Sequence, residues 1–252
     1  MSENHKSRKT VLVAGGSRGI GRSIAVALAK SGADVSIIGR DENALAQSAR
    51  QIEAHSVKAN VITADLSLPE GVELAYRRHM DAFGRVDVLV NNAAAGSSNN
   101  DILDVDVADF ERMLRINVTS YFRMSQLVCG DMKKRGWGRV INITSSTALK
   151  ARPKMGDYSI SKAGELMLTR QFAVEMAEFG ITVNAIAPTL TRTEFSRWQW
   201  EDDAELDKVV RNLPIKRLAE PEDTAGLAAF LASEAASMIT GAIIPVDGGS
   251  LA

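Results

Sequence analysis

The chain is predicted to fold as a single α/β domain, with a doubly wound parallel sheet of seven strands and helices on both faces. Short apolar runs alternate with helical patterns along the sequence, which is the order expected of a parallel sheet with helical connections. The runs are β-branched and nearly continuous in apolar character, as in parallel strands that are covered on both faces. A length of 252 residues with 6 Pro and no obvious linker favours one domain over residues 1–252.

The predicted elements follow one another as strand, helix, strand, helix to the end of the chain. Strands are expected at Val11–Ala14, Val35–Ile38, Val57–Thr63, Val86–Val90, Val140–Thr144, Thr182–Ile186 and Ala242–Val246. Helices are expected at about Ile20–Lys30, Glu42–Ala54, Pro69–Ala82, Val107–Lys134, Ser159–Phe179 and Pro221–Ala232. Sheets of this kind bind ligands at the carboxyl ends of their strands, so the residues that follow the strands are the first candidates for a functional site.

Two segments interrupt the alternation directly after strands. Ala93–Asp104 is rich in Ala, Gly, Ser and Asn, and residues 189–213 contain Phe195, Trp198 and Trp200 among acidic residues. Both are expected to overhang the ligand crevice, where loops often carry function. We interpret residues 189–213 as a substrate lid. Its aromatic side chains either cover an apolar substrate or pack the lid onto the body or a neighbouring subunit.

Composition argues against several classes of function. The 30 Lys and Arg against 31 Asp and Glu give a net charge of -1, which argues against a broad nucleic-acid-binding face. One Cys excludes an internal disulfide and a multi-Cys metal site, and the 3 His lie far apart, so no metal site is expected. No run approaches the ~18 apolar residues of a membrane span. The polar start lacks an apolar signal core. A soluble cytoplasmic protein is expected, with residues 1–9 as a flexible N-terminal segment.

A glycine-rich turn joins the first predicted strand to the first helix. Gly15, Gly19 and Gly21 have the spacing G-x3-G-x-G. Their bare backbone lets a diphosphate approach the N–H groups at the helix N-terminus, where the helix dipole favours anions. The turn therefore indicates a dinucleotide site, although a plain glycine-rich connection between strand and helix has a similar composition.

The same turn also comes close to a P-loop. The segment from Gly16 to Ser23 reads G-x4-G-R-S, with Arg22 where a P-loop has the lysine that reaches the β- and γ-phosphates. No later predicted strand ends in the Asp that a nucleotide hydrolase would use for magnesium. The P-loop interpretation is therefore disfavoured.

The residues after the second strand indicate which dinucleotide binds. A ribose 2′-hydroxyl prefers an acidic partner at the end of that strand, whereas a 2′-phosphate prefers arginine. No carboxylate stands at Gly39, and Arg40 follows it. Asp41 suits the N-cap of the next helix. Arg18 and Arg40 together favour NADP(H) over NAD(H), unless they are merely two solvated surface arginines.

A tyrosine and a lysine lie one helical turn apart near the start of a predicted helix. The i,i+4 spacing places Tyr158 and Lys162 on one face of that helix. A phenol has a pKa near 10, which is too high for acid–base work at neutral pH unless a cation lies close. Lys162 supplies that cation. The strand before this helix ends in Ser145 and Ser146, which brings hydroxyl groups to the same edge of the sheet.

Together these motifs resemble the short-chain dehydrogenase/reductase family, in its single-domain branch, over Thr10–Leu251. The resemblance implies a Rossmann-type fold and identifies residues 14–21 with the family's glycine motif and residues 91–94 with its N-N-A-G motif. It implies a catalytic tetrad of Asn117, Ser145, Tyr158 and Lys162. The cofactor-binding residues that the motifs indicate are Gly15, Ser17, Arg18, Gly19, Ile20, Gly21, Arg40, Asp65, Leu66, Asn92, Tyr158, Lys162, Pro188 and Thr193. Among them, the resemblance places Asp65 at the adenine and Thr193 at the nicotinamide amide.

The resemblance also implies a reaction. The chain is expected to be an NADP(H)-dependent oxidoreductase that interconverts a carbonyl and a secondary alcohol by hydride transfer. Tyr158 would be the general acid and base, and Ser145 would hydrogen-bond the same substrate oxygen. Lys162 would lower the pKa of Tyr158 and hold the nicotinamide ribose, while Asn117 would anchor a water in a proton relay through Lys162.

Three residues depart from the family pattern in loops that contact the cofactor. Ala14 stands where Thr is usual. The chain therefore lacks a threonine hydroxyl that would tie this turn to the loop after the fourth strand. Ala94 and Thr189 stand where Gly is usual. Their side chains are expected to narrow the nicotinamide and substrate site.

The resemblance also bears on the substrate and on the assembly state. The overall pattern is most similar to 3-oxoacyl-carrier-protein reductases and to reductases of sugars, polyols and ketones. Lys133–Arg135 would suit an acidic carrier protein, but such a helix end more often compensates the helix dipole. Alternatives to this function are an NAD(H)-dependent sugar, polyol or alcohol dehydrogenase and a non-catalytic dinucleotide-binding protein.

A homotetramer is predicted from the C-terminal end of the chain. The Val246–Gly249 ending is usual in tetrameric members of the family, and the apolar C-terminal edge strand invites pairing.

Overall fold

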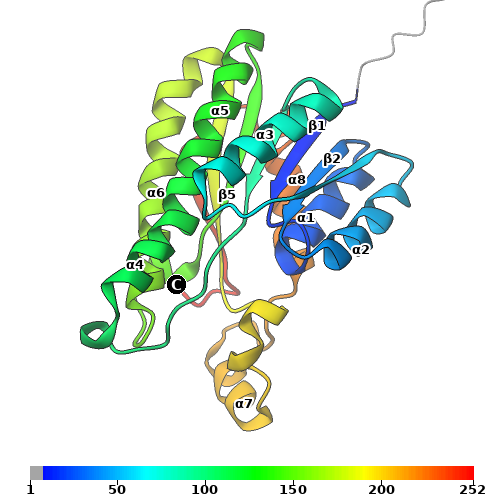
Figure 1. The fold of residues 1–252 in the computed structure, drawn as a ribbon. Coiled ribbons are helices and arrows are strands. Elements are labelled where there is room, and N and C mark those ends of the chain that lie inside the picture. Colours follow the sequence, from blue (N-terminus) through cyan, green and yellow to red (C-terminus); the bar gives the residue numbers. More distant parts are fainter. Residues whose placement is uncertain (1–7) are drawn as a thin grey trace, which may run out of the picture.

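Seven strands form one parallel sheet in the order β3-β2-β1-β4-β5-β6-β7 (Figure 1). The computed structural model describes residues 8–252, so most of the predicted flexible segment 1–9 lies outside the described residues. The strands are β1 (Thr10–Ala14), β2 (Asp34–Gly39), β3 (Ala59–Thr63), β4 (Val88–Asn91), β5 (Gly138–Ile143), β6 (Ile181–Pro188) and β7 (Ile243–Val246). Each pair of neighbouring strands is parallel, and β1, β4, β5 and β6 are buried along their whole length. The predicted fold class is confirmed.

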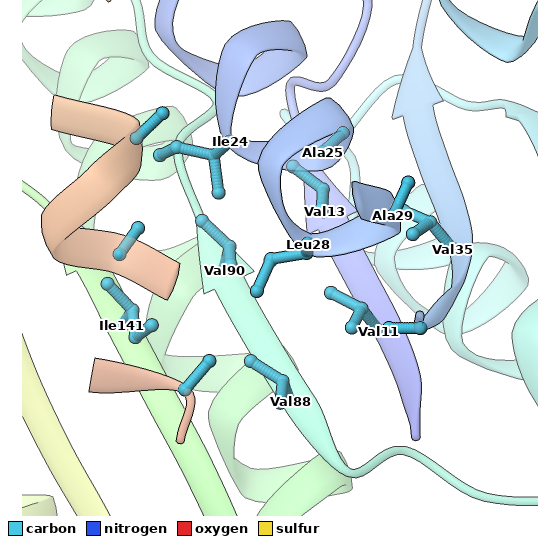
Figure 2. Close-up of a cluster of buried hydrophobic side chains, with 14 of the residues drawn as sticks. Val11, Val13, Ile24, Ala25, Leu28, Ala29, Val35, Val88, Val90 and Ile141 are labelled. Carbon is cyan, nitrogen blue, oxygen red and sulfur yellow. The ribbon is translucent and has the colours of Figure 1, made fainter. Parts of the chain in front are cut away.

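Helices cover the sheet in two layers. One face carries α1 (Gly19–Lys30), α2 (Glu42–Glu53) and α8 (Pro221–Leu231), and the other carries α3 (Pro69–Phe83), α5 (Ser120–Arg135) and α6 (Gly156–Met176). Side chains of a strand alternate between the faces. Val11 and Val13 therefore pack with Ile24 and Leu28 of α1 (Figure 2), whereas Leu12 packs in the opposite layer. Within residues 8–252, no helix is long and apolar enough to cross a membrane.

The long predicted helix Val107–Lys134 is interrupted in the structure. It consists of α4 (Val107–Leu114), a π-helical turn at Arg115–Thr119, and α5. A π turn adds a residue without ending the helix, so the spacing of apolar residues does not reveal it. Such turns are frequent at functional sites. This one carries Asn117.

The predicted lid contains a helix that the sequence did not predict. After β6, a 3-10 turn covers Glu194–Gln199 and α7 covers Asp203–Asn212. A short, largely charged helix is not readily distinguished from an acidic loop by composition. Figure 1 shows this segment, in yellow and orange, projecting beyond one edge of the sheet.

The strand order positions the functional site. Connections lead from β1 outward to β2 and β3, and from β4 outward in the opposite direction to β7. The loops after β1 and β4 therefore diverge and leave a crevice at the carboxyl edge of the sheet.

Candidate active site

A cleft of about 880 Å³ lies at the carboxyl ends of β1, β2, β4 and β5. Its walls contain all of the predicted cofactor-binding residues except Gly21 and Pro188. Gly21 lies directly behind the glycine turn, and Pro188 ends β6. Of the predicted tetrad, Tyr158 and Lys162 line the cleft. The predicted residues are thus brought together from distant parts of the chain.

The glycine turn forms a close-fitting backbone cradle. Gly15 and Gly19 have positive φ angles of 74° and 51°, which favour glycine. A Cβ atom at Gly15 would lie 2.8 Å from the backbone nitrogen of Ala93, and one at Gly21 would overlap the carbonyl oxygen of Gly15. Helix α1 begins at Gly19, and Arg18 at its N-cap makes no side-chain capping bond. The first N–H groups of α1 therefore suit an anion such as a diphosphate.

Asn92 ties the cradle to the loop after β4. Its Nδ2 donates to the carbonyl oxygen of Gly15 at 2.9 Å, and its backbone N–H donates to that of Ala14 at 3.1 Å. The hydroxyl that Ala14 lacks is thus not needed to join the two loops. Thr189, another of the three departures, is buried, and its N–H donates to the carbonyl oxygen of Val246 at 3.1 Å, which joins β6 to β7. Ala94, the remaining departure, lines the cleft.

Arg22 does not occupy a phosphate-binding position. Its Nε donates to Ser48 Oγ at 2.9 Å, and its Nη2 donates to the carbonyl oxygen of Ser17 at 2.6 Å. The guanidinium supports the turn from behind, and Arg22 is not among the residues that line the cleft. This geometry does not fit the P-loop interpretation.

Acidic residues lie close to the two arginines expected at a 2′-phosphate. Arg18 pairs with Asp41 and, at 3.5 Å, with Glu194 of the predicted lid. Asp41 caps α2 by accepting from Ala44 N at 3.0 Å. That bond, together with the charge of Arg18, holds the pKa of Asp41 below its ordinary value. Arg40 lines the cleft.

Asp65 is positioned to remain ionised. Its carboxylate accepts from Ser67 N at 2.9 Å, which lowers its pKa, and the charge of Arg40 lowers it further. Gly71 of α3 packs against the backbone of Asp65 so closely that a Cβ would overlap its carbonyl oxygen. Asp65 is therefore a fixed acceptor on the cleft wall beside Leu66.

Tyr158 is held at the start of α6 by its neighbour Asp157. The Asp157 carboxylate accepts from Tyr158 N at 2.7 Å, from Ser98 N at 2.9 Å and from Ser97 Oγ at 2.8 Å. These bonds lower the pKa of Asp157 against the effect of its burial. They also fasten α6 to the Ala93–Asp104 segment, so the position of the phenol depends on both.

The Tyr158 side chain lies close to Ser145 and Lys162. Ser145 hydrogen-bonds to the phenol, and Lys162 Nζ lies 5.6 Å from the centroid of its ring. Burial raises the pKa of Tyr158, whereas Lys162 and Ser145 oppose the rise by favouring the phenolate. Lys162 Nζ donates to the carbonyl oxygen of Ile143 at 3.0 Å. This set of groups can transfer a proton at a substrate oxygen.

The side chain of Asn117 joins the π turn to its surroundings. Its Oδ1 accepts from Ala95 N at 2.8 Å, and its Nδ2 donates to Ser161 Oγ at 2.9 Å. Asn117 thus links the loop after β4 to α6 next to Lys162. This role of the side chain could not be inferred from the sequence, because Ala95 and Ser161 lie 22 and 44 residues away.

The three aromatic residues of the lid have different surroundings. The Phe195 ring centroid lies 6.5 Å from that of Tyr158, and a Cβ atom at Gly96 would lie 3.2 Å from the Phe195 ring. Trp200 packs within the lid, where its Nε1 donates to Ser196 Oγ at 3.1 Å and Arg192 lies over its ring. Trp198 is exposed. Of the three, Phe195 is the one that lines the cleft.

Glu165 is a charged residue next to the site that the sequence analysis missed. It is fully buried, and its Oε1 lies 2.7 Å from Lys162 Nζ. The i,i+3 spacing from Lys162 was visible in the sequence. Its significance depends on the burial of both side chains, which only the tertiary structure shows.

Comparison with known proteins gives full-length matches. Residues 14–250 match the family model described as enoyl-(acyl carrier protein) reductase. Dehydrogenase/reductase SDR family member 4 of Bos taurus is 34% identical over 248 residues, which cover 98% of this chain and 89% of the bovine protein. A protein of Sinorhizobium meliloti 1021 described as a short-chain alcohol dehydrogenase has 36% identity and a TM-score of 0.92, covering 97% of both chains. A Beutenbergia cavernae protein described as an NAD(P) dependent gluconate 5-dehydrogenase, solved with bound NADP at low occupancy, has 33% identity and a TM-score of 0.92, covering 98% of both chains.

Proposed function

This chain belongs to the short-chain dehydrogenase/reductase family of oxidoreductases, and we propose that it is an NADP(H)-dependent enzyme that interconverts a carbonyl and a secondary alcohol. The observation that carries the proposal is the position of Tyr158 and Lys162 on the same cleft as the glycine cradle. An anion-binding helix start and a proton-transferring phenol at one cleft suit a nicotinamide dinucleotide and a carbonyl substrate.

Each residue of the proposed tetrad has its own role in the reaction. When bound, the nicotinamide supplies or accepts the hydride. Tyr158 gives its proton to the substrate oxygen in reduction and takes it back in oxidation, while Ser145 hydrogen-bonds the same oxygen. Lys162 favours the phenolate through its charge and would hold the nicotinamide ribose. Asn117 fixes the loop after β4 against α6 and thereby keeps the cleft in shape.

The experiment that tests the proposal is an activity panel. Ketones, diketones and the corresponding alcohols are incubated with NADP(H) and NAD(H) in both directions, and cofactor absorbance is recorded. Reduction of at least one carbonyl with NADPH is expected. Binding of NADPH without turnover of any substrate would favour the non-catalytic alternative, which the presence of Tyr158 and Lys162 disfavours.

A sugar-acid or polyol substrate is the second candidate. It is supported by the similarity to the Beutenbergia cavernae protein described as a gluconate 5-dehydrogenase. A carrier-protein substrate has less support, because the basic end of α5 is used within the fold. Arg135 pairs with Asp87 at 2.7 Å, and Lys133 lies over the Phe179 ring at 3.8 Å. Gluconate and other polyols therefore belong in the panel.

We interpret residues 189–213 as the substrate lid. Support comes from Phe195, which lies beside Tyr158, and from Glu194, which pairs with Arg18 at 3.5 Å across the cleft. The lid would thus contact both the reacting end and the phosphate end of the site.

Replacing Gly21 with Ala is expected to weaken NADPH binding about tenfold or more, because the new Cβ must displace Gly15 or Asn92 at a cost of roughly 1–3 kcal/mol. Titration of NADPH fluorescence measures this. Gly226→Ala is the matched control, since Gly226 is exposed within α8 and its Cβ would meet no atom within 4 Å. That variant should bind NADPH normally and be more stable by ~0.5–1 kcal/mol. Unchanged affinity in Gly21→Ala would place the dinucleotide elsewhere.

The chain is expected to form a homotetramer of about four times 27.1 kDa. Ile160, Met167 and Val174 are exposed at intervals of seven residues on α6, and the short edge strand β7 is only partly buried. Light scattering at micromolar concentration measures the mass, and Met167→Glu should reduce the assembly. A monomeric wild type would refute the prediction, and a dimer would leave the helix surfaces plausible and put the C-terminal edge in doubt.

A further inference from the structure

The catalytic lysine candidate lies between two titratable groups on one side of α6. Tyr158 precedes Lys162 by four residues and Glu165 follows it by three, so all three side chains share one face of the helix. Glu165 is 0% exposed and Lys162 1% exposed. Their Oε1 and Nζ atoms are 2.7 Å apart. The ammonium that should favour the Tyr158 phenolate is therefore already paired with an acid.

Beside Lys162, the groups around Glu165 are weakly polar. Tyr121 of α5 is fully buried, lies 5.5 Å from Lys162 Nζ by its ring centroid, and interacts electrostatically with Glu165. The hydroxyl of Thr144, which follows β5, donates to the carbonyl oxygen of Lys162 at 3.0 Å and lies close enough to the Glu165 carboxyl to favour its ionised form. The second carboxyl oxygen, Oε2, has no hydrogen-bond partner in the described part of the chain. Lys162, Tyr158 and Tyr121 are the titratable groups that act on Glu165.

This environment makes the ionised acid costly. A buried carboxylate with one unpartnered oxygen loses its hydration and only partly regains it from a single ion pair. Burial raises the pKa of Glu165 to about 7, although Lys162 opposes the rise. Glu165 therefore remains protonated to a higher pH than an exposed glutamic acid does.

The two states of Glu165 have opposite effects on Tyr158. When Glu165 is ionised, its charge cancels that of Lys162 and raises the pKa of Tyr158. When Glu165 is protonated, the Lys162 charge acts on the phenol without this opposition. We propose that Glu165 is a positioning residue that acts through Lys162, setting how strongly the Lys162 ammonium favours the Tyr158 phenolate. This inference rests on the proposed function of Tyr158 and adds a residue that controls it.

The pH profile of alcohol oxidation tests the inference, because that direction requires the phenolate. Glu165→Gln and Glu165→Leu both remove the negative charge. Each should shift the rise of kcat/KM to lower pH by about one unit, the effect of a unit charge several ångströms away at intermediate dielectric. Glu175→Gln removes a charge from the exposed side of the same helix and should leave the profile unchanged. If both Glu165 variants fold and retain the wild-type profile, the inference is overturned.

A titration of the phenol provides a readout without turnover. The chain has only 3 Tyr, and the pKa values of Tyr76 and Tyr121 are both raised by burial. Subtraction of the Tyr158→Phe spectrum from the wild-type ultraviolet titration isolates Tyr158. Its ionisation should shift to lower pH in Glu165→Gln, and coincident curves would contradict the inference.

Two further results distinguish a failure of the proposed function from a failure of the proposed role of Glu165. If Tyr158→Phe remains active, the proposed function itself fails; if it is inactive while the Glu165 profiles coincide, only the role of Glu165 fails. Should neither Glu165 variant fold, Glu165→Asp takes their place in the phenol titration, because its shorter side chain moves the carboxylate away from Lys162 Nζ. The ionisation of Tyr158 should again shift to lower pH. Coincident curves for Glu165→Asp and the wild type would overturn the inference.

Discussion

Replacing Tyr158 with Phe is expected to abolish turnover while leaving NADP(H) binding intact. The change removes one hydroxyl and almost no volume, so α6 and its attachment through Asp157 remain in place. What is lost is the group that transfers the proton, and general acid–base catalysis contributes about 10²–10⁴-fold. Steady-state kinetics on the best substrate of the panel, together with NADPH fluorescence titration, measure the two effects separately.

The control for this variant is Tyr76→Phe. Tyr76 lies on α3 and is not among the residues that line the cleft, so its loss should leave kcat unchanged. Residual activity of Tyr158→Phe above about a tenth of wild type would show that another group moves the proton, since the expected loss is at least a hundredfold. A loss of NADPH affinity instead would show that the phenol mainly holds the cofactor.

Local patterns in the sequence predict the frame of this site well. Continuous Val and Ile runs indicate buried parallel strands, and the rule that ligands bind at their carboxyl ends places Gly15, Asn92 and Ser145 at one edge. Asp41 was expected to cap α2, and it does so through Ala44 N. These predictions succeed because each depends on neighbouring residues or on one general rule of topology.

The remaining features depend on contacts between distant residues. Glu194 pairs with Arg18, which lies 176 residues away in sequence, and no local pattern indicates this. The π turn at Asn117 leaves the helical pattern intact. Glu165 resembles any polar residue on a helix until its burial is known. The charges around a site are therefore less predictable from sequence than its backbone.

Cofactor preference is the second large effect expected of this chain. Arg40 lines the cleft after β2, where the adenine ribose of a dinucleotide would lie, and Gly39 supplies no carboxylate to accept from a ribose 2′-hydroxyl. Arg18 stands on the same cleft, but a 2′-phosphate would have to compete with Asp41 and Glu194 for its guanidinium. Exposed ion pairs of this kind are worth only about 0–1 kcal/mol, so a phosphate can replace them.

The wild type is accordingly expected to prefer NADP(H) over NAD(H) at least tenfold in kcat/KM, since each contact between arginine and phosphate contributes ~1.5–3 kcal/mol. Arg40→Asp should reverse the preference, because the new carboxylate repels a 2′-phosphate and accepts from a 2′-hydroxyl. Arg50→Asp makes the same change of charge on the exposed side of α2 and should keep the wild-type preference. Equal or better use of NAD(H) by the wild type would mean that Asp41 and Glu194 hold Arg18 more tightly than a phosphate does. The site would then gain nothing from a 2′-phosphate despite its two arginines.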